Sequence, residues 1–176
     1  MPWYALRSLK RANATHPDHK ELAERGFQVF TPMHEVVVSA ATGRRHSVSR
    51  PVLPDLLFAR AEKPALDSAV ADIPTLQYRY QRGHRIDDPM TVRDDDMDRF
   101  IRAVTADSAS PRYYAPGELP PGLLGATVRI IGGPLDGITA RLLKIRGTRR
   151  RRILVELPAL VAASVEVAPD LLEIVS

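Results

Sequence analysis

The sequence predicts an α+β domain followed by a small β-barrel domain. In the first half of the 176-residue chain, segments typical of strands and helices follow one another. From Leu124 onward only short Val-, Ile- and Leu-rich runs appear, separated by turn residues. Between the halves, residues 107–122 contain four prolines and two glycines, too many for a continuous helix or strand. We therefore expect one domain over residues 1–106, a linker over 107–122 and a barrel domain over 123–176.

Composition narrows the class of protein. The chain has no cysteine, which excludes disulfides and thiolate metal sites and suits a reducing compartment. No apolar run reaches the length of a membrane span, and the first residues lack a signal-peptide pattern, so we expect a soluble, cytoplasmic protein without membrane contact. Net charge is +4, and residues 137–155 contain seven basic side chains and no acidic one. Such a local basic excess is typical of proteins that contact nucleic acid.

The elements of the first half can be placed in order. Residues 3–7 form a short aromatic strand, and a helix then begins near Thr15 and ends at Gly26. A strand over 27–38 leads to a hairpin tip at 39–46, where Gly43 precedes Arg44 and Arg45. The chain returns through 47–50. A short helix over 65–71 and a strand over 76–80 follow.

The segment 50–60 predicts a strand that is covered on both faces. Its prolines confine the entry to extended backbone, and past Pro54 the apolar side chains no longer alternate with polar ones. Leu57 and Ala59 lie on one side, and Leu56 and Phe58 on the other. One face must pack on the domain's own helices, whereas the other needs a second layer of this chain or a partner.

The last helix of the first half is the clearest. Three aspartates, residues 94–96, occupy its start, where the helix dipole favours negative charge. Met97, Phe100, Ile101 and Val104 then recur at helical spacing and predict one apolar stripe, which we interpret as core packing. The same dipole explains the aspartates without a magnesium ion.

In the second half, strands are expected over 126–131, 138–145, 153–157, 164–167 and 171–175. Residues 125–137 consist of a glycine, an alternating strand and a Gly-Pro-containing turn, and this segment resembles the KOW motif. In the first half, the pair Trp3-Tyr4, the segment 53–59 and the proline-led entry at 88–97 are similar to the N-terminal domain of the NusG family. Asp55-Leu56 in place of Gly-Tyr, Ala140 in place of a glycine, and residues 76–83 in place of a long glycine-rich segment resemble the specialised paralogs of the RfaH and UpxY type.

This resemblance implies a transcription elongation or antitermination factor. In the family, the N-terminal domain binds RNA polymerase at the clamp helices of its largest subunit and suppresses pausing, and the KOW domain recruits a second partner. The residues carried over as polymerase-binding are Tyr4, Leu53, Pro54, Leu56 and Phe58. The alternative is that Leu56 and Phe58 are covered within the chain. RfaH can refold its KOW domain into a helical hairpin, but the β-branched residues here favour a barrel in the resting state.

Basic residues suggest further contacts. Arg149, Arg150, Arg151 and Arg152 form either a solvated hairpin tip or a contact with phosphate or an acidic protein. By family geometry, Arg44 and Arg45 face upstream DNA or the polymerase. A KOW-type RNA-binding or ribosome-associated protein remains the alternative function.

Catalytic and metal-binding constellations are not expected. The five histidines (His16, His19, His34, His46 and His84) are scattered and complete no ligand cluster. Gly132-Gly133-Pro134 lacks the Lys-Ser/Thr pair of a phosphate loop, and no serine lies in a nucleophile elbow. The sequence therefore predicts neither an enzyme nor a bound cofactor.

Overall fold

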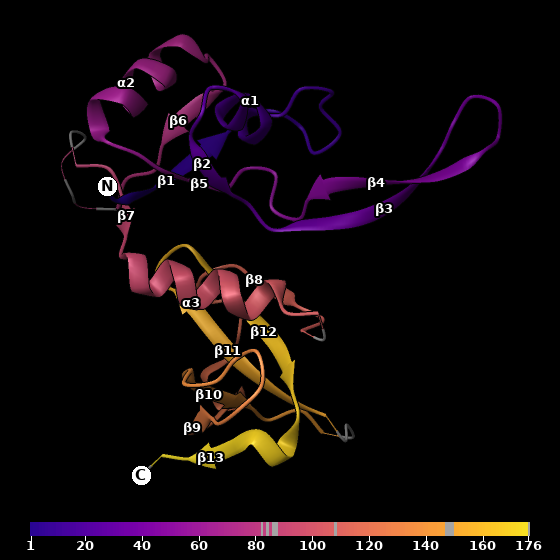
Figure 1. Ribbon diagram of the computed structural model, residues 1–176, viewed down its shortest axis with the longest axis vertical. Helices are drawn as coiled ribbons and strands as arrows, with labels where there is room; N and C mark the ends of the chain where they lie inside the picture. Colours follow the sequence, from indigo (N-terminus) through magenta and orange to yellow (C-terminus); the bar gives the residue numbers. More distant parts are fainter. Residues whose placement is uncertain (82, 84, 86–87, 108, 147–149, 176) are drawn as a thin grey trace. The chain divides into compact units, whose positions relative to one another are not determined.

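The computed structural model describes residues 1–81, 83, 85, 88–107, 109–146 and 150–175 (Figure 1). Their contacts divide the chain into two compact units, Met1–Arg93 and Asp94–Ser176, and each is described by itself below.

The first unit is built on a five-stranded antiparallel sheet. Its strand order is β2 (Gln28–Phe30), β5 (Leu57–Arg60), β1 (Trp3–Ser8) and β6 (Leu76–Tyr78), and β7 (Thr91–Val92) also pairs with β1. Helices α1 (Asp18–Glu24) and α2 (Lys63–Asp72) bury Leu22, Leu66 and Ala69 against one face of this sheet. The apolar core of the unit therefore lies between that face and the two helices.

A separate two-stranded hairpin extends from this unit. It consists of β3 (Met33–Ser39) and β4 (Arg45–Pro51), and Figure 1 shows it projecting beyond the sheet. The expected strand over 27–38 is thus divided into β2 and β3. The division falls at Thr31, whose hydroxyl donates to the carbonyl of Leu56, and at Pro32, which cannot donate a ladder hydrogen bond.

The second unit combines one helix with a six-stranded antiparallel sheet. The strand order is β13 (Leu172–Ile174), β9 (Leu124–Ile130), β10 (Thr139–Leu143), β11 (Arg151–Leu157), β12 (Val161–Val167) and β8 (Arg112–Tyr114). Short 3₁₀ helices at Pro121–Leu123 and Pro169–Leu171 precede β9 and β13. Val128, Ile130, Ile153 and Val165 are fully buried within this unit, as expected for β-branched residues that line a small barrel.

The α+β fold class is confirmed, including strands rather than helices in the second half. Two details differ from the expectation. Helix α3 (Asp94–Thr105) packs against β11 and β12, so it groups with the barrel and not with the first sheet. Residues 112–114, expected in the linker, form β8 and pair with β12. A segment of three extended residues between breakers is long enough to add an edge strand.

Candidate functional site

The cross-strand register of the first sheet decides which residues of the predicted binding patch share a face. Ala5 lies opposite Phe58, and Trp3 lies opposite Arg60. Because side chains alternate along a strand, Arg7 projects from this side too. We call this surface, made by Trp3, Ala5 and Arg7 of β1 and Phe58 and Arg60 of β5, the Phe58 face.

Tyr4 does not belong to the Phe58 face. It lies opposite Ala59 and is part of the core cluster beneath α1 and α2, with 6% of its surface exposed. Its ring makes an edge-on contact with Tyr78 at 5.8 Å between centroids. The prediction that Tyr4 and Phe58 form one patch is therefore wrong. Trp3 and Arg7 share the face with Phe58, and combining strand alternation with an antiparallel pairing of the two segments would have found them.

The exposure of the predicted patch also differs from the expectation. Leu56 and Phe58 are 3% and 0% exposed, whereas Leu53 is half-buried and Pro54 is exposed. Arg7 is exposed as well. The structure therefore does not contain an uncovered apolar strand. Leu56 and Phe58 are covered within the chain, as the alternative interpretation holds. The accessible groups of this region, Leu53, Pro54 and Arg7, lie at its margin.

The turn that carries Leu53 and Pro54 is held in one conformation from several sides. Its ends are joined by a hydrogen bond from the amide of Leu56 to the carbonyl of Leu53. Arg79 Nη2 donates to the carbonyl of Asp55 at 2.9 Å and to its carboxylate at 3.1 Å. Asp55 replaces the glycine of the family pattern, and in this chain its carboxylate anchors the turn to the segment that follows β6.

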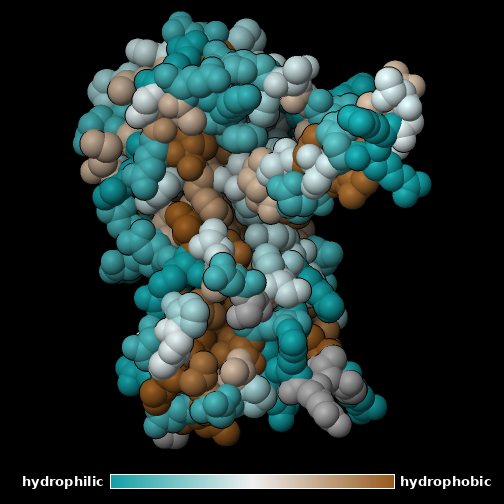
Figure 2. Space-filling view, turned by 45° about the vertical axis from the view of Figure 1, so that its right-hand side comes forward, coloured by the Kyte–Doolittle hydropathy of each residue, from teal (hydrophilic) through white to brown (hydrophobic). Residues whose placement is uncertain are grey.

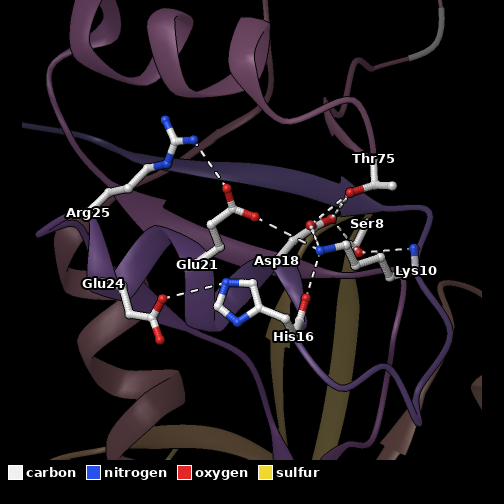
Figure 3. A network of polar contacts seen from close by, with 8 residues as sticks. All are labelled: Ser8, Lys10, His16, Asp18, Glu21, Glu24, Arg25 and Thr75. Atoms are coloured by element: carbon white, nitrogen blue, oxygen red, sulfur yellow. Dashed lines mark hydrogen bonds and ion pairs between the residues drawn. The ribbon is translucent and has the colours of Figure 1, made fainter.

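A buried carboxylate fixes the start of α1, at the same end of the sheet as the loop that follows β1 (Figure 3). Asp18 is 1% exposed and accepts hydrogen bonds from Ser8 at 2.7 Å and from Thr75 at 2.8 Å. The ammonium group of Lys10 lies 3.1 Å from the same carboxylate. Since every oxygen of Asp18 faces a donor, this network holds β1, α1 and β6 together and does not leave a group free for chemistry.

The histidines near this network do not form a metal site. His16 lies 3.5 Å from Glu24, and burial lowers the pKa of His19, against the opposing charge of Asp18. Among the residues that the structure describes, no group of three His, Cys, Asp or Glu side chains could hold a metal ion. His84 lies outside the described residues. Asp96 is engaged by Arg99 at 3.0 Å, which agrees with a charged helix start.

The predicted basic hairpin tip between β3 and β4 is present. Arg44 and Arg45 are both exposed, and the turn closes through the amide of Ala40, which donates to the carbonyl of Arg44. Gly43 has a φ of 81°, which only glycine adopts readily. Figure 2 shows hydrophilic atoms beside apolar ones on the projecting hairpin, where Val37 is 67% exposed. The arginines are therefore accessible, and their binding role stays a prediction.

The second predicted basic tip is largely engaged within the protein. Arg149 lies outside the described residues. Arg150 forms an ion pair with Glu166 at 2.6 Å, which lowers the pKa of that carboxyl. Arg152 is 5% exposed and donates to the side chain and carbonyl of Ser164 and to the carbonyl of Ser110. Among the three described arginines, only Arg151 is exposed and forms no ion pair, so the prediction of a hairpin tip with four solvated guanidinium groups is wrong.

Comparison with known proteins settles the family. A family model described as "Transcription termination factor nusG" matches residues 1–101, more than half of the chain. The chain belongs to the NusG family. Proteins of this family are transcription factors that bind RNA polymerase, and they are not enzymes.

The structure agrees with this assignment. The fold resembles that in a solved structure titled "Domain interaction in Thermotoga maritima NusG", with a TM-score of 0.50 and 16% sequence identity over 99% of this chain and 97% of that one. A search of curated proteins gave no match. Within the described part of this NusG-family chain, no helix is long and apolar enough to cross a membrane.

Proposed function

We propose that this NusG-family protein binds transcribing RNA polymerase through its N-terminal unit and suppresses pausing or termination. The contact is with the clamp helices of the largest subunit, and the C-terminal barrel recruits a second protein. The observation that carries the proposal is the family match over residues 1–101, which covers all of the first unit. The specialised role of an RfaH- or UpxY-type paralog is part of the proposal and rests on the sequence departures at Asp55, Leu56 and Ala140.

The turn at Leu53 and Pro54, together with Arg7 at the margin of the Phe58 face, is the proposed contact. Phe58 and Trp3 of that face are buried within the chain, so the contact is proposed for the accessible groups at its edge. Leu53, Pro54 and Arg7 offer accessible groups at this surface, and Arg79 keeps the turn in place. A preorganised turn binds at a smaller cost in conformational entropy than a mobile one.

The experiment measures the affinity of purified polymerase for the full chain and read-through of a strong pause in the same preparation. Because Leu56 and Phe58 are buried, charged replacements there would disturb folding, so the test variant is Leu53→Glu combined with Arg7→Glu. Losing one apolar contact of Leu size costs about 1.5–3 kcal/mol, so affinity should fall at least about tenfold, and read-through should fall with it.

A matched control keeps the conclusion specific. Ala65→Glu adds a charge at an exposed position of α2, which packs on the opposite face of the sheet. It should bind polymerase as the unmodified chain does. Equal losses in both variants would move the contact away from the Phe58 face. If the unmodified chain has no affinity for polymerase from its own source, the proposed function is wrong.

A further inference from the structure

The outer surface of strands β9 and β10 carries basic side chains that the proposed polymerase contact does not use. Arg129 on β9 lies opposite Thr139 on β10, and Arg141 on β10 lies opposite Thr127 on β9. Their neighbours along the strands, Val128 and Ala140, pair with each other and are buried. Arg129 and Arg141 are exposed, so they point outward from the same side of the sheet as diagonal neighbours, about 7–8 Å apart at their Cα atoms.

A third cationic side chain, that of Lys144, lies next to Gly125 on this surface. The Nε of Arg141 donates to the carbonyl of Gly125 at 2.7 Å, so the guanidinium group is oriented by the backbone. A Cβ on Gly125 would lie 3.6 Å from Cγ of Lys144 and only 3.2 Å from the carbonyl oxygen of Leu142. The pairing register of β9 and β10 shifts between Arg141 and Leu143, and both Arg141 and Lys144 lie next to Gly125. We call Arg129, Arg141 and Lys144 the β9–β10 cationic face.

The charges of this face are available to a ligand. Within the described part of the chain, none of the three side chains forms an ion pair, in contrast to Arg150 and Arg152, which Glu166 engages. Glu173 lies opposite Arg129 on the edge strand β13, and the two side chains do not form an ion pair. Thr127 and Thr139 lie opposite Arg141 and Arg129 on the same surface, and their hydroxyl groups can donate further hydrogen bonds.

We infer that the β9–β10 cationic face binds the phosphodiester backbone of a single-stranded nucleic acid. Guanidinium and ammonium groups are the usual partners of phosphate, and a shallow sheet surface with cations on two adjacent strands suits a strand that crosses it. Its described outward residues, Thr127, Arg129, Thr139, Arg141 and Glu173, include no aromatic ring on which a base could stack. Binding is therefore directed at the backbone and tolerates any sequence.

Fluorescence anisotropy tests this inference with the full chain and no polymerase, so its outcome is independent of the proposed function. The probes are labelled oligo(U) and oligo(dT) of equal length, titrated at several salt concentrations. Replacing Arg129, Arg141 and Lys144 by Ser should weaken binding of both probes. Since each phosphate contact with a single strand contributes about 0.7 to the slope of log K against log salt, the slope should become shallower by about 2.

The control variant changes net charge by the same amount. Arg25→Ser, Lys63→Ser and Arg99→Ser remove two arginines and one lysine that are already paired with Asp72, Asp67 and Asp96. This variant should keep the salt slope of the unmodified chain, and circular dichroism should show both variants folded. An unchanged slope in the test variant, an equal loss in the control, a loss confined to one of the two probes, or the absence of binding by the unmodified chain would each overturn the inference.

Discussion

Arg152 is a charge buried in the sheet of the second unit. Its Nη2 donates to the carbonyl of Ser110 at 2.6 Å and to that of Ser164 at 2.8 Å, and its Nε donates to the Ser164 hydroxyl at 3.0 Å. Burial lowers the pKa of this guanidinium, which nevertheless stays charged because its ordinary value is so high. The contact with Ser110 ties the segment after α3 to β12, and the amide of Glu166, which donates to the carbonyl of Ala109, reinforces it.

Replacing Arg152 by Met tests this role. Met has a similar length but cannot donate, so the carbonyls of Ser110 and Ser164 lose their partner. Leaving buried polar groups without hydrogen bonds should lower the free energy of unfolding by about 1–3 kcal/mol. Urea denaturation followed by circular dichroism measures the change. Arg151→Met, at an exposed neighbouring position, should leave the urea midpoint almost unchanged; equal effects at 151 and 152 would contradict a specific role for residue 152.

Because of Tyr113, we expect the stability of the folded chain to depend on pH in the alkaline range. Burial of its phenol in β8 raises its pKa from 10.0 to about 12. The folded chain therefore holds this proton more tightly than the unfolded chain. The resulting stabilisation is complete below pH 10.0 and disappears as pH rises from there to about 12. The urea midpoint of the unmodified chain should fall across this window more than that of Tyr113→Phe. Parallel curves for the two proteins would show that Tyr113 does not titrate in this range.

At the scale of elements, the buried face of α3 can be predicted from the sequence, but the sheet that covers this face cannot. Its stripe of Met97, Phe100 and Val104, together with Ala103, is buried, as its helical spacing predicts. The periodicity shows that the helix has a covered face, but it does not show which sheet covers it. The contacts of α3 with β11 and β12 decide this in favour of the barrel.

Removing α3 should therefore destabilise the barrel. We compare the fragment 94–176 with the fragment 106–176 by thermal unfolding. Without the helix, the outer surface of β11 and β12 is exposed to water, and each kcal/mol lost lowers the midpoint of a domain of this size by about 4–8 °C. We expect the shorter fragment to unfold at a clearly lower temperature. Identical midpoints would show that α3 contributes nothing to the barrel.

At the scale of the whole molecule, the division into units can be located by limited proteolysis with trypsin. Arg93 is exposed and is the last residue of the first contact-defined unit, whereas Arg112 lies in β8 and pairs with Ser164 of β12. Arg93 lies in the connection between β7 and α3 and is part of neither, whereas Arg112 is held in a strand pairing, so we expect cleavage after Arg93 to precede cleavage after Arg112. Mass spectrometry of early fragments distinguishes the two sites. Early cleavage after Arg112 would favour the linker over 107–122 that the breaker-rich sequence predicts.

The candidate site was only partly predictable. The absence of polar alternation past Pro54 predicts a strand with two apolar faces, and β5 has them. The register against β1 separates Tyr4 from Phe58, and that register is formed by residues more than fifty positions apart. The four consecutive arginines differ for a similar reason: Arg151 and Arg152 are adjacent, but they point to opposite sides of β11, so one is exposed and the other is buried beside Ser164.

Local sequence patterns predict most of the helices and strands in their order, the turns set by glycine and proline, and the resemblance to the NusG family. These properties depend on local backbone preferences and on apolar periodicity, which a few neighbouring residues specify. The folded structure is needed to show which side chains share the Phe58 face, which sheet α3 covers, and which arginines stay available on the β9–β10 cationic face. Each of these depends on hydrogen-bond register and burial between segments far apart in the chain, which no local pattern encodes.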